Sequence, residues 1–413
     1  MKVLHIATTD RVGGAAISAY RQHVGLRDAG VESEMLVKVK VTDNPYVQTW
    51  NPPRELRYRL PRVLRRQYLK KVAPKPMAWR PFSDVRGEFG WCKTDVLPPH
   101  DVVNIQFTAD FADQPALLQK LDPKTPVVIT MHDMNPLTGG CHYTMGCSEY
   151  MEKCGRCPQL QSTANGDLSR GIWERKFRMY EMLASRKVCY VANSRWLAHQ
   201  AEESSLLRSR PITAINCGLD TNIFRPLDRT FARQALGIPL DARVVMFAAD
   251  SVENERKGGQ YLYEALAGIK MPLHLVTAGA GHPPSGLKMK TLHLGNLDCE
   301  NLLALAYNTA DVFVIPSTQE AFGQTALEAS ACGVAVAGFN AGGIAEIIAD
   351  GETGLLCPVK NTLALREAIE RLLLNEDMRK AMGVKGRQRV EERFTLAMFA
   401  NQYLKVYQDL LGL

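Results

Sequence analysis

Residues 316–333 read Pro-Ser-Thr-Gln-Glu-Ala-Phe-Gly-Gln-Thr-Ala-Leu-Glu-Ala-Ser-Ala-Cys-Gly. The apolar run Val312–Ile315 just before them is short enough for a buried parallel strand, and small and apolar residues recur at helical spacing over residues 323–332. The stretch therefore predicts a strand, a loop and a helix. Glu320 would lie in the loop at the carboxyl end of the strand and Glu328 more than one turn into the helix, so that both carboxylates can face one crevice.

The start of this predicted helix is typical of an anion site. The first-turn amides of Gly323, Gln324 and Thr325 have no acceptor within the helix, and the helix dipole adds partial positive charge, so a phosphate can dock there. Glu320 could accept hydrogen bonds from sugar hydroxyls, and Glu328 from both hydroxyls of a ribose. Either glutamate alone would be interpreted as a solvated surface residue, and only the surrounding pattern favours a site.

This pattern resembles the signature of retaining glycosyltransferases of family 4, also called glycosyltransferase group 1. In the signature, Phe322 and Gly323 follow the first glutamate and Ala-Cys-Gly follows the second. Residues 342–348 (Gly-Gly-Ile-Ala-Glu-Ile-Ile) and 350–356 (Asp-Gly-Glu-Thr-Gly-Leu-Leu) are similar to the next two blocks of the family, in order. Upstream, the similarity continues through residues 216–226, and it reaches Met1 with varying strength.

The resemblance implies a GT-B fold, in which two Rossmann-like, doubly wound α/β domains face each other across a cleft. It also implies transfer of a sugar from a UDP or GDP sugar, with retention of the anomeric configuration and no cofactor for catalysis. Fixed cations and helix amides would stabilise the departing diphosphate. In this mechanism Glu320 positions the sugar, and Phe322, Gly323, Gln324, Thr325 and Glu328 hold the donor.

Length and composition limit the classes of protein. The chain of 413 residues exceeds one ordinary core, so two domains are expected. A net charge of +7 suits anionic small molecules or a membrane surface and falls short of a dedicated nucleic-acid binder, so no nucleic-acid partner is expected. Because no run of 18 apolar residues and no secretory apolar segment occurs, we expect a cytoplasmic protein.

The amino-terminal residues predict a strand over residues 2–7 and a helix that opens at Gly13 and Gly14 and ends near Gly30. The loop between them lacks the spacing of a dinucleotide fold and the lysine of a P-loop, and a tight turn would explain the two glycines equally well. In the resemblance, Gly13 and Gly14 match glycines whose amides approach the donor phosphate and the acceptor.

A basic segment occupies residues 54–71, where eight Arg or Lys residues stand against Glu55 alone. Apolar residues fall near one face of a helix that Pro61 could begin, so the segment could lie on anionic lipid. A solvated face or a loop is an equal alternative from the residues alone. The family often uses lipid-linked acceptors at the inner membrane, which favours peripheral membrane contact.

The predicted strand Val127–Met131 ends in His132 and Asp133. Polar residues at the carboxyl end of a parallel strand belong in a ligand crevice, although a lone histidine there is more often structural. In the family this histidine contacts the donor sugar and lines the acceptor site, so His132 is a candidate catalytic residue. Asp133 could instead cap or orient the following loop.

The next loop holds a cluster of cysteines: Cys141, Cys147, Cys154 and Cys157. The last two have the spacing that lets both thiolates reach one tetrahedral zinc ion, and the first two could complete a structural site. A redox Cys-x-x-Cys and two disulfides are competing interpretations. Most family members lack this insertion, but a subset linked to exopolysaccharide assembly has similar cysteines.

Strands and helices alternate again from residue 243, which predicts a second parallel sheet. We expect an acceptor-binding domain over residues 1–210, with the cysteine-rich loop at 132–160, and a donor-binding domain over 211–395. A helix over about 396–413 would return to the first domain. Arg256 and Lys257 are candidates for holding the diphosphate, while Ser251 stands where the family usually has an arginine.

Four functions compete in principle. The first is a glycosyltransferase acting on a glycan or lipid-linked acceptor in cell-surface polysaccharide synthesis. A GT-B nucleotide-sugar epimerase or a phosphorylase dependent on pyridoxal phosphate would use the same fold, and a binding module would give no turnover. The transferase is favoured because its motifs occur together and in order.

Overall fold

The computed structural model describes residues 1–51, 60, 63, 64, 67, 81–87, 89, 90 and 96–413. Contacts divide the chain into two compact units, one formed by Met1–Asn216 with Phe399–Leu413 and the other by Cys217–Met398. The sequence predicts the ends of the two domains at residue 210 and at about residue 396. Most of the basic segment 54–71 lies outside the described residues.

The first unit is built on a parallel sheet of seven strands in the order β3-β2-β1-β4-β5-β6-β7. The strand order reverses beside β1, as in a doubly wound fold, and loops at the carboxyl ends of β1 and β4 therefore diverge around a crevice. The elements of the unit are β1 (Lys2–Thr9), α1 (Gly14–Asp28), β2 (Glu32–Val39), β3 (Val47–Thr49), β4 (Val102–Ile105), α3 (Gln114–Lys120), β5 (Val127–Met131), α4 (Leu168–Leu183), β6 (Val188–Ala192), α5 (Arg195–Glu203), β7 (Ile212–Ala214) and α13 (Leu396–Leu411), most of which is in this unit.

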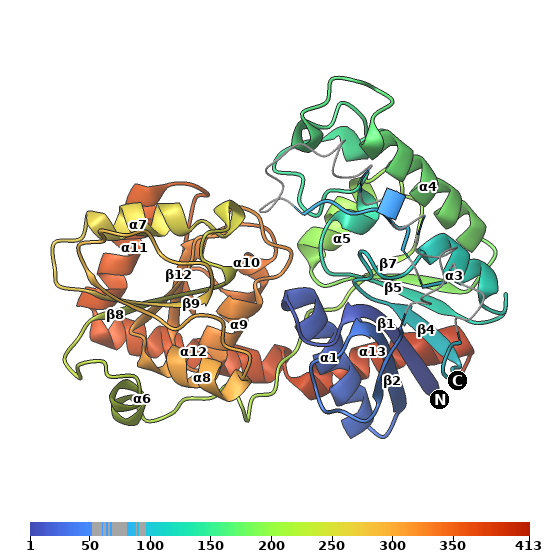
Figure 1. The fold of residues 1–413 in the computed structure, drawn as a ribbon. Helices are drawn as coiled ribbons and strands as arrows, with labels where there is room; N and C mark the ends of the chain where they lie inside the picture. The colour runs from blue at the N-terminus through green and yellow to red at the C-terminus, as the bar shows by residue number, and fades with distance from the viewer. Residues whose placement is uncertain (52–59, 61–62, 65–66, 68–80, 88, 91–95) are drawn as a thin grey trace. The chain divides into compact units, whose positions relative to one another are not determined.

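The second unit repeats the plan with six parallel strands in the order β10-β9-β8-β11-β12-β13. Helices α7 and α11 cover one face of this sheet and α8, α9 and α12 the other (Figure 1). The elements are α6 (Arg229–Ala235), β8 (Val244–Ser251), α7 (Gly259–Ala267), β9 (His274–Ala280), β10 (Lys290–His293), α8 (Glu300–Thr309), β11 (Val312–Ile315), α9 (Gln324–Ala331), β12 (Ala335–Phe339), α10 (Ile344–Ile347), β13 (Gly354–Cys357), α11 (Thr362–Leu374) and α12 (Glu376–Arg393).

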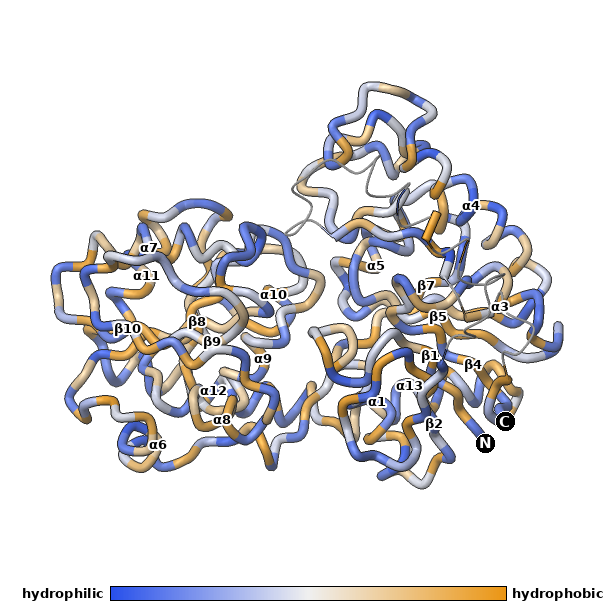
Figure 2. The backbone as a smooth tube through the Cα atoms, viewed as in Figure 1, coloured by the Kyte–Doolittle hydropathy of each residue, from blue (hydrophilic) through white to orange (hydrophobic). Residues whose placement is uncertain are grey.

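Apolar residues concentrate along the central strands of both units (Figure 2). Every residue of β5 and of β11 is buried, because a parallel strand covered by helices on both faces needs apolar side chains on both sides. No helix among the described residues is long and apolar enough to cross a membrane.

Helix α13 is fixed to the first unit by buried polar contacts. The hydroxyl of Tyr407 accepts hydrogen bonds from Gln22 Nε2 of α1 at 2.8 Å and from Asn104 Nδ2 of β4 at 2.7 Å. The hydroxyls of Tyr403 and Thr130, the latter on β5, lie 3.3 Å apart. The carboxyl-terminal helix therefore contacts three elements that come from the start of the chain.

Candidate active site

The loop between β11 and α9 brings Glu320 against two cations. Lys257 Nζ donates to Glu320 Oε2 at 2.8 Å, and Arg256 Nη1 donates to the same oxygen at 3.1 Å. Burial alone would raise the pKa of the Glu320 carboxyl, but the charges of Lys257 and Arg256 outweigh it and lower the pKa to about 2. The carboxylate is thus ionised, and two cations against this one anion favour binding of a further anionic group.

The two cations reach this loop because the backbone comes unusually close. Arg256 and Lys257 lie in the short helix η4 (Glu255–Lys257), directly after β8. Gly258 follows with φ +75°, and a Cβ atom there would lie 1.9 Å from the carbonyl oxygen of Pro316. Only glycine permits this approach. Thr318 N also donates to the carbonyl of Arg256 at 2.8 Å, so the two loops are joined through their backbones.

The start of α9 is shaped by a pair of glycines from the 342–348 block. Gly343 N donates to the carbonyl of Glu320 at 3.0 Å, and a Cβ on Gly342 would lie 1.9 Å from that same oxygen. Gly323 precedes α9 with φ +104°, a conformation that favours glycine. The block that resembles the family's second motif therefore supports the loop that carries Glu320.

Gln324 and Thr325 open α9, and Phe322 is buried directly before it. Glu328, one turn further, is only 4% exposed, and Tyr307 of α8 donates its hydroxyl to Glu328 Oε2 at 3.0 Å. Tyr307 is a neighbour that the sequence did not predict. Its bond fixes the orientation of the carboxylate that we expect to receive a ribose.

Ser251 ends β8 and is buried. Its hydroxyl accepts a hydrogen bond from Glu253 N at 3.3 Å, which shapes the turn that leads to Arg256. A serine in this place supplies no cation, so the positive charge of this part of the site comes from Arg256 and Lys257.

In the first unit, the predicted glycines Gly13 and Gly14 lie at the start of α1. Gly13 has φ +88°, and a Cβ atom on it would meet no described heavy atom within 4 Å. Glycine is therefore favoured at position 13 by the positive φ angle and not by close neighbouring atoms.

The ring of His132 is held in one tautomer by Gln106. Gln106 Nε2 donates to Gln22 Oε1 at 2.7 Å and lies 3.1 Å from His5 Nδ1, so its Oε1 is the acceptor that faces His132 Nε2 at 2.7 Å. The proton of His132 is then on Nε2. Among the described residues, the buried Nδ1 of His132 has no hydrogen-bond partner, and burial lowers the pKa of the ring to about 4. His132 therefore presents a neutral acceptor nitrogen.

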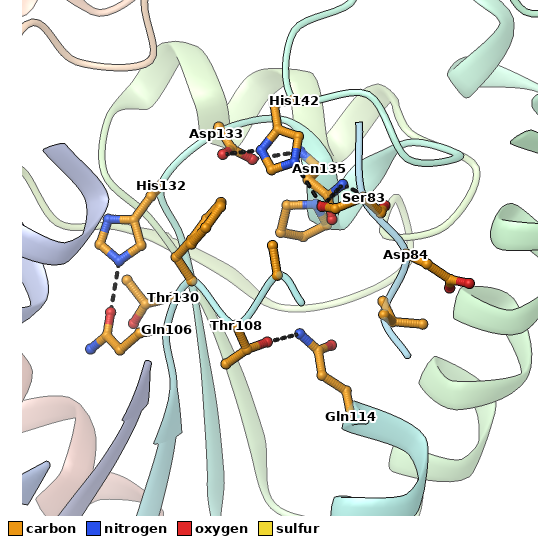
Figure 3. Close-up of a pocket in the computed structure, with 14 residues that line it drawn as sticks. Ser83, Asp84, Gln106, Thr108, Gln114, Thr130, His132, Asp133, Asn135 and His142 are labelled. Carbon is orange, nitrogen blue, oxygen red and sulfur yellow. Dashed lines mark hydrogen bonds and ion pairs between the residues drawn. The ribbon is translucent and has the colours of Figure 1, made fainter. Parts of the chain in front are cut away.

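His132 lines a pocket of the first unit, together with residues that follow β4 and β5 (Figure 3). Most of the residues that line it are polar, among them Ser83, Gln106, Thr108, Thr130, Asp133, Asn135 and His142. Asp133 Oδ1 accepts from Asn135 N at 2.8 Å, so Asp133 does orient the following loop. Its other oxygen lies 2.7 Å from His142 Nδ1, a contact that the sequence did not indicate.

The four cysteines of the next loop do not form a metal site in the structure. Across the described part of the chain, no group of three or more His, Cys, Asp or Glu side chains is placed to hold a metal ion, and the nine cysteines of that part are free. Burial raises the pKa of the Cys141 thiol to about 12 and that of Cys154 to about 11, which favours protonated thiols. The four thiols nevertheless lie close enough to raise one another's pKa values, and zinc at this cluster stays a prediction.

The loop instead has a buried lysine at its base. Lys176 of α4 donates to the carbonyls of Asn135 and Thr138, the latter at 3.0 Å. Burial lowers the pKa of this ammonium to about 8. These contacts tie the loop to α4.

Two predicted groups of residues are thus found in definite places. The structure brings Arg256, Lys257 and Glu320 together, with Phe322 and Gly323 in the supporting loop. His132 lies in a polar pocket of the first unit. The sequence did not indicate Gln106, Ser83 or His142 as site residues. The one available signal was that His142 directly follows Cys141 in the cysteine segment.

The two parallel-sheet units are those of the GT-B fold. The solved structure of sucrose-phosphate synthase from Thermosynechococcus elongatus covers 100% of this chain with a TM-score of 0.69 at 20% identity. HepE from Anabaena, solved in complex with UDP and glucose, covers 99% of this chain with a TM-score of 0.65 at 16% identity. These likenesses establish the fold alone.

The match to a family lies within the second unit. Residues 228–389 match the family described as glycosyl transferases group 1, so this part of the chain confirms the resemblance inferred from the sequence. The D-inositol 3-phosphate glycosyltransferase of Saccharomonospora viridis is 30% identical over 222 residues, which are 49% of this chain and 51% of that protein. The chain thus spans about half the length of the curated relatives it matches.

Proposed function

We propose that the protein is a retaining glycosyltransferase that moves a sugar from a UDP or GDP sugar to a glycan or lipid-linked acceptor in cell-surface polysaccharide synthesis. The observation that carries this proposal is the cluster of Arg256, Lys257 and Glu320 beside the start of α9. The match of residues 228–389 to a glycosyltransferase family supports it, as does the UDP bound by HepE, a protein of the same fold.

The donor would be held by the second unit. Its diphosphate would meet Arg256, Lys257 and the first amides of α9, while Glu328 would accept hydrogen bonds from the ribose. As the bond from the anomeric carbon to the diphosphate breaks, negative charge grows on the leaving oxygen. Cations that are already held in place by Glu320 can stabilise this charge with little reorganisation.

The acceptor would be held by the first unit. His132 presents a neutral nitrogen with a fixed lone pair, which suits a hydroxyl donor from a sugar. Glu320 would position the donor sugar, and no covalent intermediate on it is proposed. The site of action would be the inner face of the membrane if the basic segment 54–71 contacts anionic lipid.

Incubation of the protein with a panel of UDP and GDP sugars and polyprenyl-linked or glycan acceptors tests the proposal. We expect a glycosylated product by mass spectrometry, with the anomeric configuration of the donor by proton NMR. Conversion of one nucleotide sugar into another without an acceptor would point to an epimerase. No turnover with any donor, from a protein that binds nucleoside diphosphates, would favour a binding module.

A further inference from the structure

Three side chains of the first-unit pocket form a continuous row of hydrogen bonds (Figure 3). Ser83 Oγ lies 2.7 Å from His142 Nε2, and His142 Nδ1 lies 2.7 Å from Asp133 Oδ2. The order is hydroxyl, imidazole, carboxylate. Ser83 comes from a segment 59 residues away from His142 in the sequence, so the fold assembles this row.

The geometry indicates which atoms can donate. A carboxylate oxygen accepts hydrogen bonds, so the 2.7 Å contact places a proton on His142 Nδ1, which donates to Asp133 Oδ2. With the proton on Nδ1, the other ring nitrogen, Nε2, can accept the hydrogen bond of Ser83 Oγ at 2.7 Å. Asn135 Nδ2 lies 3.2 Å from the same Oγ and can donate to it, which polarises the hydroxyl from both sides.

The backbone holds this geometry from both sides of the pocket. Phe82 and Cys141 form an antiparallel bridge, Ser83 N donates to the carbonyl of Gly140 at 2.9 Å, and His142 N donates to that of Pro81 at 3.2 Å. His142 is 3% exposed and Asp133 8%, whereas Ser83 is only partly buried. The imidazole and its orienting carboxylate are thus largely shielded from water, while the residue Ser83 keeps some exposure.

We propose that Ser83 is a nucleophile, activated by His142 and Asp133, that takes an acyl group from a small acyl ester. Nucleophile, base and orienting carboxylate in hydrogen-bond contact are the arrangement that activates a serine on unrelated folds. Thr108, whose hydroxyl accepts from Gln114 Nε2 at 2.8 Å, lines the same pocket and can turn its own proton toward a developing oxyanion. This activity is separate from sugar transfer and does not depend on it.

The reaction balances without a further reagent. Ser83 Oγ forms a bond to the carbonyl carbon of the ester while its proton passes to His142 Nε2, and Asp133 stabilises the resulting imidazolium. The bond from that carbon to the ester oxygen breaks, and the departing alkoxide takes the proton from His142. Water then attacks the acyl-serine in the same way, which releases a carboxylic acid and restores Ser83.

The test is covalent labelling of the full chain with an alkyl fluorophosphonate, together with release of p-nitrophenolate from p-nitrophenyl acetate. Peptide mass spectrometry of the wild type should place the phosphonyl group on Ser83. Ser83→Ala should remove the label, and His142→Gln should slow both labelling and ester hydrolysis by at least about 100-fold, as loss of a general base does. Ser185→Ala, at an exposed serine of the same unit, is the matched control and should react like the wild type.

The wild-type peptide map decides the question even where a variant fails to fold. A wild type whose Ser83 stays unlabelled would overturn the proposal and leave the row as a structural tie between residues 81–83 and 140–142. Labelling of Ser83 at an unchanged rate in a natively melting His142→Gln or Asp133→Asn variant would overturn it as well. Thermal melting of each variant shows which of them are folded.

Discussion

Glu320 shows how one residue can serve both the fold and the chemistry. Its carboxylate is 7% exposed and holds Arg256 and Lys257 in place before any ligand arrives. When one partner of a buried ion pair is removed, the charge of the other partner is left uncompensated. A bound phosphate would compensate the positive charge of Arg256 or Lys257. The same cluster that stabilises the loop is therefore prepared to bind an anion.

The burial of the His132 ring predicts how the stability of the folded chain depends on pH. Its pKa is about 4 in the folded chain against 6.5 for an ordinary histidine, so the unfolded chain binds more protons between these values. The contribution of His132 to stability is therefore complete above about pH 6.5 and is lost as the pH falls toward 4. His5 and His23 act in the same direction, because burial lowers both of their pKa values.

Calorimetric melting of His132→Gln between pH 7 and about 4 checks this prediction. The melting temperature of the variant should fall less steeply with decreasing pH than that of the wild type. His199→Gln changes an exposed histidine and should keep the wild-type slope. Identical slopes for wild type and His132→Gln would contradict the assignment of a neutral, buried ring.

At the level of single residues, local pattern predicted the site in part. The spacing of Glu320 and Glu328 and the adjacent pair Arg256 and Lys257 were visible in the sequence, because each follows a strand in the chain. The partners that complete the sites were not visible. Tyr307 meets Glu328 across two helices, and Ser83 meets His142 through long-range folding, so no local spacing could indicate them.

Helix α13 is the element that carries the chain back to the first unit. The hydroxyl of Tyr407 accepts from the buried amides of Gln22 and Asn104. Tyr407→Phe would leave both donors without this partner and should destabilise the first unit by roughly 2–3 kcal/mol. Differential scanning calorimetry should show a lower melting temperature, while Tyr46→Phe, at a partly exposed tyrosine, should leave it unchanged. Equal melting of Tyr407→Phe and wild type would show that the network contributes little.

The cysteine-rich loop leads to a prediction about metal content. The sequence predicts one structural zinc ion, although the four thiols are not arranged around a metal position in the structure. Elemental analysis of protein purified without chelator should give about one equivalent of zinc, and a Cys154→Ser, Cys157→Ser variant should lose it. Less than about half an equivalent in the wild type would refute the site and agree with the protonated thiols described above. Retention of the metal by the variant would exclude these ligands.

Strands that are buried on both faces were the easiest elements to predict. The limits of β5 and β11 coincide with their apolar runs, because both strands are buried on both faces. Strand β2, with the sequence Glu-Ser-Glu-Met-Leu-Val-Lys-Val, begins with three consecutive polar residues and was not predicted. The zinc site stays a prediction, because cysteine spacing alone does not specify where the thiols point.

For the whole molecule, the alternation of strands and helices and the length of the chain predicted two parallel-sheet units. The division observed at residues 216 and 398 follows from contacts across the chain, which the sequence does not give directly. The assignment of the acceptor to the first unit and of the donor to the second remains a proposal.

The basic segment 54–71 yields a prediction for the full chain. If it forms an interfacial helix, changing Arg62, Arg65 and Arg66 together to Glu should reduce sedimentation with anionic liposomes, at roughly 1 kcal/mol per lost cation. The control variant carries Glu in place of three exposed lysines, Lys124, Lys270 and Lys385. Its net charge changes by the same amount as that of the Arg62, Arg65 and Arg66 variant, but it should bind liposomes as the wild type does. Equal binding of the Arg62, Arg65 and Arg66 variant and the wild type would assign the segment to solvent.

We propose that the second unit binds a nucleoside diphosphate through Lys257 and Glu328. Titration calorimetry with UDP and GDP measures this directly in the wild type, Lys257→Ala and Glu328→Ala, with Lys270→Ala at an exposed lysine as control. We predict that at least one nucleotide binds the wild type and the control equally, and that each site variant binds at least about 10-fold more weakly, as loss of a charge-assisted hydrogen bond implies. A wild type that binds neither nucleotide, or site variants that bind as the wild type does, would contradict the claim.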